Sequence, residues 1–111
     1  AYNQVNLRPN GEPYHPKEEG NGYLLIFDDL NVYIAGDTED IPELSQLQNI
    51  DIAFLPMNLP YTMTPEMAAK AALSFKPKVL YPYHYGQTNP SELTNILGPD
   101  SGIEVRIRQL R

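Results

Sequence analysis

The sequence contains no cysteine and no tryptophan, and it has only two histidines, His15 and His84. Without cysteine the chain can form neither a disulfide framework nor a thiolate metal site. No run approaches the roughly 18 consecutive apolar residues that a membrane-spanning helix needs, and no signal-peptide pattern opens the chain. These absences predict a cytoplasmic protein without a membrane span, in which any metal ligands are carboxylates or imidazoles.

Positive charge is also scarce, with 8 Lys and Arg against 14 Asp and Glu and a formal net charge of −6. An acidic chain is repelled by the phosphates of nucleic acid and by an anionic membrane surface, so we expect neither as a partner. The length of 111 residues predicts a single domain over 1–111. Because the sequence begins at Ala1 rather than Met, we expect it to be part of a longer polypeptide.

Runs of apolar residues between turn signals predict a chain of alternating strands and helices. The expected strands are 22–27, 32–35, 50–55, 79–83 and 103–107. The first two are joined by a short polar turn and should form a hairpin. The continuous apolar runs at 22–27 and 50–55 predict buried strands, whereas the alternation over 103–107 predicts a half-exposed edge strand.

The helices are predicted from their end signals. Asp40 and Glu43 have the spacing of a capping box for a first short helix. Thr64 followed by Pro65 is typical of a second helix start, and Gly98 ends a third helix. The order β-β-α-β-α-β-α-β then predicts an α/β protein of the α+β type. We expect a mixed sheet with its helices mainly on one face.

Two side chains able to bind a metal lie at predicted strand ends. Asp37 follows the strand 32–35, and His84 follows the strand 79–83. Ligands of α/β sheets bind beyond the carboxyl ends of strands, and a carboxylate with an imidazole suits zinc, iron or manganese. Alternatively, Asp37 only binds a nearby amide in a turn, and His84 is a packed, hydrogen-bonded residue. Taken alone, single residues of these types more often have the structural role.

Four segments change that balance, namely YIAGDTEDIPEL at 33–44, IDIAFLP at 50–56, MTPEMAA at 63–69 and KPKVLYPYHYG at 76–86. In this order and spacing they resemble the metallo-β-lactamase superfamily, specifically its metal-dependent hydrolase branch. That branch includes the lactonase that opens ascorbate-6-phosphate and the phospholipase that cleaves N-acylphosphatidylethanolamine. The resemblance implies an αββα sandwich, of which this chain would be the C-terminal half.

The resemblance also implies roles for particular residues. Asp37 matches the aspartate that bridges two metal ions, and His84 matches the last histidine ligand, on the second metal. Asn3 stands where the family normally has a further histidine. His15 is the nearby candidate to replace that ligand, or else a loop histidine bonded to the backbone; both alternatives stay open. The expected cofactor is a pair of divalent metal ions, with zinc as the expected metal.

The family's His-x-His-x-Asp-His motif is absent from this sequence, which predicts weak or no metal binding and no activity for the chain by itself. In an intact member, a metal-activated water attacks an ester, lactone or phosphodiester. Asp37 would then have the catalytic role of holding the ions and orienting the water. Tyr61, Tyr83 and Tyr85 are candidates to contact a small-molecule or phosphodiester substrate, and packing is the alternative for each.

Two classes of function stay open from the sequence. One is the C-terminal portion of a metal-dependent hydrolase, and the other is a metal-free structural or interaction module that keeps part of the fold. In both, the sheet face that meets the other half of the sandwich is expected to be apolar. A chain that exposes such a face is expected to self-associate through it, unless the rest of a longer protein covers it.

Overall fold

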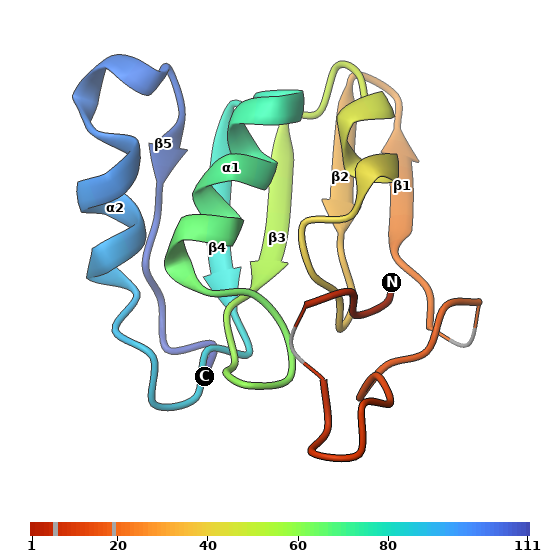
Figure 1. The fold of residues 1–111 in the computed structure, drawn as a ribbon. Coiled ribbons are helices and arrows are strands. Elements are labelled where there is room, and N and C mark those ends of the chain that lie inside the picture. Colours follow the sequence, from red (N-terminus) through yellow and green to blue (C-terminus); the bar gives the residue numbers. More distant parts are fainter. Residues whose placement is uncertain (6, 19) are drawn as a thin grey trace.

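The structure is a computed structural model that describes residues 1–5, 7–18 and 20–111. Within these residues, one sheet carries its helices on one face (Figure 1). The elements in chain order are β1 (Tyr23–Phe27), β2 (Leu30–Ile34), η1 (Pro42–Gln46), β3 (Ile52–Pro56), α1 (Pro65–Phe75), β4 (Val79–Tyr83), α2 (Ser91–Leu97), η2 (Pro99–Ser101) and β5 (Glu104–Val105). This order confirms the predicted succession of strands and helices.

The sheet has five strands in the order β1-β2-β3-β4-β5. β1 and β2 form an antiparallel hairpin in which Tyr23 pairs with Ile34, and every later pairing is parallel. The predicted mixed sheet and hairpin are therefore confirmed. β5 lies at the edge, as predicted, but it is shorter than the predicted strand 103–107.

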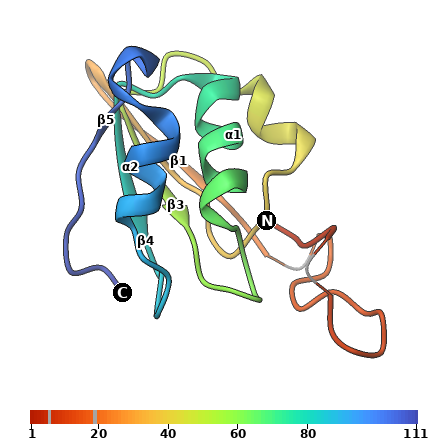
Figure 2. The same cartoon turned by 60° about the vertical axis from the view of Figure 1, so that its left-hand side comes forward.

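The core lies between the sheet and the helices, which lie in front of the sheet in Figure 1 and to one side of it in Figure 2. Leu55 of β3 and Leu80 of β4 are fully buried there, together with Ala68 and Ala72 of α1. The small alanine side chains let the helix approach the sheet closely. Burying a leucine of this kind contributes roughly 1.5–3 kcal/mol. No helix in the described part of the chain is both long and apolar enough to cross a membrane.

The boundaries of α1 follow from residues that the sequence identifies. The Thr64 side chain accepts a hydrogen bond from the Met67 amide at 3.1 Å, and Pro65 occupies the first turn. Thr64 thus satisfies one of the free backbone amides at the start of the helix. The ring of Pro65 fixes a backbone angle that suits the first helical turn. The helix ends at Phe75, and its C-cap residue Lys76 has a left-handed backbone with φ 47°. The predicted start and end of this helix are confirmed.

The predicted capping box at Asp40 and Glu43 is wrong. A 3₁₀ helix forms instead, its N-cap is Ile41, and no side chain caps it. Asp40 lies 3.7 Å from the ammonium of Lys70, and Glu43 accepts a hydrogen bond from the Tyr2 hydroxyl at 3.1 Å. Both carboxylates therefore bind partners from distant segments, which local spacing does not reveal.

The prediction of a buried strand at 22–27 is also wrong, because all five residues of β1 are exposed. β1 is an edge strand, and its apolar residues lie on both faces of the sheet. The register places a set of apolar side chains on the face opposite the helices, which we call the open face (Figure 2). Its members are Tyr23, Leu25, Phe27, Leu30, Val32, Ile34, Ile52, Phe54, Val79, Tyr81 and Tyr83.

Candidate functional site

Asp37 and His84 come from the carboxyl ends of two strands of the same sheet. Asp37 follows β2 by way of Gly36, and His84 directly follows β4. Gly36 has φ +69°, and a Cβ at this position would lie 2.3 Å from the Asn21 carbonyl oxygen, so the turn requires glycine. Asp37 Oδ1 lies 2.8 Å from His84 Nδ1. The two side chains therefore meet, whereas their role as metal ligands stays a prediction.

Two further side chains reach the same place. The Nε2 atom of His15 lies 4.0 Å from Asp37 Oδ2, and the Nδ2 atom of Asn58 lies 3.3 Å from His84 Nε2. Asn58 follows β3, so the loops after three neighbouring strands all contribute to the site. The strand-end argument that selects Asp37 applies equally to Asn58, which the sequence analysis does not select.

These residues line a cleft of about 460 Å³, a size typical of small-molecule sites. The lining residues are Arg8, Tyr14, His15, Asp37, Asn58, Tyr61 and His84. Of the three tyrosines predicted to contact substrate, only Tyr61 is among them. Arg8 and Tyr14 belong to a polar N-terminal loop and carry no local sequence signal, because only long-range packing places them here.

Tyr83 and Tyr85 lie outside this cleft. Tyr85 is buried and donates a hydrogen bond to the Arg108 carbonyl oxygen at 2.7 Å. Tyr83 packs edge-on against Phe54 on the open face, with ring centroids 6.1 Å apart. Burial raises the pKa of Tyr83, and the negative charge of Asp37 raises it further. Both side chains therefore pack against other parts of the chain. Their contact with a substrate stays a prediction.

Asn3 is buried and uses its side chain to join three segments. Its Nδ2 donates to the Tyr61 carbonyl oxygen at 2.7 Å, and its Oδ1 accepts from the His15 amide at 2.5 Å. The backbone amide of Asn3 in turn donates to the His15 carbonyl oxygen at 2.9 Å. Asn3 therefore fixes the backbone of His15.

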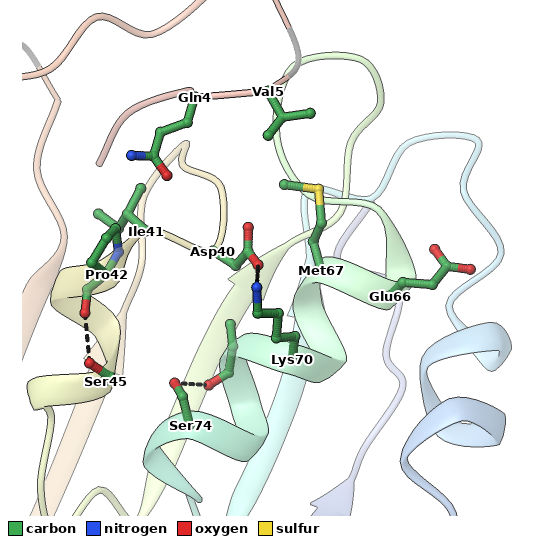
Figure 3. Close-up of a pocket in the computed structure, with 11 residues that line it drawn as sticks. Gln4, Val5, Asp40, Ile41, Pro42, Ser45, Glu66, Met67, Lys70 and Ser74 are labelled. Carbon is green, nitrogen blue, oxygen red and sulfur yellow. Dashed lines mark hydrogen bonds and ion pairs between the residues drawn. The ribbon is translucent and has the colours of Figure 1, made fainter.

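A larger cleft of about 560 Å³ lies between η1 and α1 (Figure 3). Two of its charged groups pair with each other, since Asp40 lies 3.7 Å from Lys70. Its serines bond to their own helices: Ser45 donates to the Pro42 carbonyl oxygen, and Ser74 donates to that of Ala71. None of the predicted site residues lines this cleft, so size alone does not identify the functional site.

The donor types of the smaller cleft suit a divalent metal, but their number does not complete a centre. Zinc sites use about four ligands, at least three of them from protein. Among the described residues, no group of three or more His, Cys, Asp or Glu side chains is arranged to hold a metal ion. The described part of this chain thus offers a carboxylate and two imidazoles, and further donors are needed.

A mixed sheet with helices on one face and a carboxylate–imidazole pair at its strand ends places the chain among α/β proteins with a polar cleft at that edge of the sheet. Residues 2–84 match the model of a β-lactamase superfamily domain, which covers most of the chain. The chain therefore belongs to the metallo-β-lactamase superfamily, as its sequence segments predict. A relative from Lysinibacillus sphaericus, described as a UPF0173 metal-dependent hydrolase, is 42% identical over 74 residues. That match covers 64% of this chain and 33% of the relative.

Solved structures of two proteins share the fold. A protein from Parabacteroides distasonis, described as a metal-dependent hydrolase, is 61% identical with a TM-score of 0.92, covering 100% of this chain and 49% of that one. A metallo hydrolase from the archaeon Ignicoccus hospitalis is 26% identical with a TM-score of 0.70, covering 80% of this chain and 42% of that one. The chain thus spans about a third of the curated relative and about half of the closer of these two structures.

Proposed function

We propose that this chain is the C-terminal portion of a metal-dependent hydrolase, with Asp37 and His84 as metal ligands. The observation that carries the proposal is the meeting of Asp37 Oδ1 and His84 Nδ1, 2.8 Å apart, in a cleft at the carboxyl ends of the strands. The relatives are named as metal-dependent hydrolases, which supports the proposal. Zinc suits the carboxylate and imidazole donors, and donors from outside the described residues would complete the centre.

A bound divalent metal would supply an acidified water for attack on an ester, lactone or phosphodiester. The chain's own residues hold the donors in place. Asp37 fixes one ring nitrogen of His84, and Asn58 lies 3.3 Å from the other. A metal would take the place of one of these two partners, and the contact at the other ring nitrogen would hold the imidazole in orientation. By itself the chain is proposed to be inactive, because its donor set is partial.

His15 is proposed as a third donor, which would have to turn toward Asp37 and His84, because the three side chains are not arranged to hold a metal as they stand. The backbone N–H of His15 donates to the Asn3 side chain, and its carbonyl oxygen accepts from the Asn3 backbone. The Nε2 atom of His15 lies 4.0 Å from Asp37 Oδ2. This position favours a role at the site over the alternative of a loop histidine bonded to the backbone. Asn3 itself has its amide engaged by Tyr61 and His15, which argues against Asn3 as a ligand.

The second candidate function is a metal-free interaction or structural module. The open face favours it, since Tyr23 and Phe27 of β1 are both more than half exposed. Exposed apolar surface of this kind marks an interface. In this alternative, self-association through the open face is the activity that matters, and Asp37 with His84 is a structural hydrogen-bonded pair.

Metal analysis of the complete natural protein separates the two functions. We expect Asp37→Ala to lose most of the bound divalent metal, because it removes a charged ligand. Asp29→Ala is the matched control, since Asp29 lies in the exposed turn between β1 and β2 and outside the cleft. An Asp37→Ala protein that keeps the bound metal of the control would contradict the ligand assignment. The absence of bound metal from both the control and the unchanged protein would favour the metal-free module.

A further inference from the structure

The N-terminal segment brings one permanently charged cation to the smaller cleft, which contains the proposed metal donors Asp37, His84 and His15 and which we call the metal-donor cleft. Arg8 lines this cleft together with Asp37 and the two histidines. Its backbone is held in a tight turn, in which the Arg8 amide donates to the Glu12 carbonyl oxygen at 2.7 Å and the Gly11 amide donates to the Arg8 carbonyl oxygen at 2.9 Å. An isolated bridge between Leu7 and Pro13 closes the same turn.

The Arg8 side chain rests on an aromatic pair. Its guanidinium carbon lies 5.0 Å from the centre of the Tyr14 ring. The Tyr14 ring meets the Tyr61 ring edge-on, with centroids 4.9 Å apart and an angle of 81° between the planes. A guanidinium stacked in this way is attracted by the ring and loses part of its freedom, so less entropy is lost when it binds a ligand.

Arg8 has no carboxylate partner among the described residues. Three other basic side chains do have one: Lys70 pairs with Asp40, Lys78 with Asp51, and Arg106 with Glu104. Of the basic residues without a carboxylate partner in the described ranges, Arg8 is the one that lines the cleft with Asp37 and the two histidines. No carboxylate oxygen in the described ranges lies within 4.0 Å of the Arg8 guanidinium, although Asp37 lines the same cleft. The cleft therefore holds a cation whose charge its own walls do not neutralise by a direct ion pair.

We propose that Arg8 selects substrates that carry a carboxylate or phosphate group, bound by the guanidinium while the hydrolysable bond lies at Asp37 and His84. This inference rests on the proposed hydrolase function and names its substrate class. A guanidinium offers paired N–H donors in the geometry that both oxyanions accept. The rings of Tyr14 and Tyr61 supply apolar surface for the rest of the molecule in a cleft of about 460 Å³.

The test uses the complete natural protein, freed of metal by a chelator, so that no metal holds the anion. The probes are benzoate, phenyl phosphate and the neutral benzamide, titrated with detection by NMR. We expect at least one anion to bind roughly ten- to hundredfold more tightly than benzamide, as charge-assisted hydrogen bonds allow. The tighter of the two anions identifies the carboxylate or the phosphate source.

Three variants locate the effect. Arg8→Gln is expected to remove the preference for the anion, and Arg8→Lys is expected to keep a reduced preference because the charge remains. Lys17→Gln is the matched control: Lys17 lies 5.3 Å from the Tyr2 ring, in the same N-terminal segment, but does not line the cleft. It removes the same charge and should leave the preference unchanged.

Equal binding of benzamide and both anions overturns the proposal, as does an undiminished preference in Arg8→Gln or no anion binding at millimolar concentration. The metal analysis of Asp37→Ala is independent of these titrations. Loss of metal in that variant without Arg8-dependent anion binding would refute the substrate class alone. Arg8-dependent anion binding with unchanged metal content would instead refute the hydrolase site.

Discussion

At the scale of single residues, Glu39 is fully buried. Its carboxylate holds the N-terminal segment in place. Its Oε1 atom accepts from the amides of Gln4 and Val5, the latter at 2.6 Å, and its Oε2 lies 3.5 Å from the Asn3 side chain. Asn3 in turn fixes His15. Glu39 therefore acts on the metal-donor cleft through the backbone, without lining the cleft itself.

Replacing Glu39 by Gln tests this role. The variant keeps the shape but loses a charged acceptor, so we expect a loss of about 1–3 kcal/mol in the free energy of unfolding. We also expect the NMR signals of the His15 ring to shift or broaden. Glu12→Gln is the control, because Glu12 is exposed and outside the cleft, and exposed changes have small effects. Unfolding curves that coincide for the two variants would contradict the anchoring role.

Gly36 gives a second prediction at this scale. Gly36→Ala would place a Cβ 2.3 Å from a backbone oxygen in a left-handed conformation. Gly102→Ala is matched, because Gly102 has φ +79° but open space around its Cβ position. We expect Gly102→Ala to cost about 1–2 kcal/mol from backbone strain alone. Gly36→Ala should cost clearly more, and comparable losses in denaturant unfolding would show that the turn before Asp37 relaxes easily.

At the scale of elements, Asp51 ties the starts of three strands together. Its side chain accepts from the Asn31 amide at 2.8 Å and lies 3.1 Å from the Lys78 ammonium. Asn31 belongs to β2, Asp51 precedes β3, and Lys78 precedes β4. The Asn31 amide, and then Lys78, lower the pKa of Asp51 below its usual value of 3.8. The carboxylate form is thus favoured in the folded chain.

This lowered pKa predicts a pH dependence with a definite sign. The stabilisation by Asp51 is fully present above its unfolded pKa of 3.8 and is lost as the pH falls through the lower folded pKa. Asp51→Asn should therefore be less stable than the unchanged chain at pH 7, and the difference should shrink toward pH 3. Urea unfolding at a series of pH values measures it. A difference that does not depend on pH would contradict the assignment to charge.

The elements differ in how well the sequence predicts them, and the reasons are physical. α1 is predictable because Thr64, Pro65 and its alanine stripe act within a few residues of each other. The capping box at Asp40 fails because Lys70, thirty positions away, binds that carboxylate. β1 looks buried because both of its faces are apolar, and the sequence cannot show that it lies at an edge.

The residues of the candidate site also differ in how well the sequence predicts them. Asp37 and His84 follow predicted strands, so the fold brings them together by a rule that needs no tertiary detail. Arg8 and Tyr14 reach the cleft only because the N-terminal segment packs against the loop that contains Tyr61. Their place depends on long-range contacts of a polar loop, for which the sequence has no periodic signal.

At the scale of the whole molecule, the open face predicts association of the 111-residue chain. Phe54 stacks on Tyr81 at 5.0 Å, and the exposed leucine Leu25 extends the apolar surface toward the edge. Burying this face removes apolar area from water. The net charge of −6 opposes contact between copies, but at physiological salt such repulsion is screened beyond roughly 8 Å. We therefore expect a concentration-dependent increase in mass by light scattering at physiological salt.

Leu25→Lys tests whether the open face causes this association. The variant places a charge within the open face, so it should shift the chain toward monomer and reduce the binding of an apolar dye. Leu73→Lys is the matched control, because Leu73 is 45% exposed against 40% for Leu25 but lies on α1, across the sheet. Equal association of both variants would place the contact elsewhere. A clean monomer that binds no dye would contradict the predicted association. It would show that the open face is stable in water, because its stacked aromatic rings already cover enough apolar area.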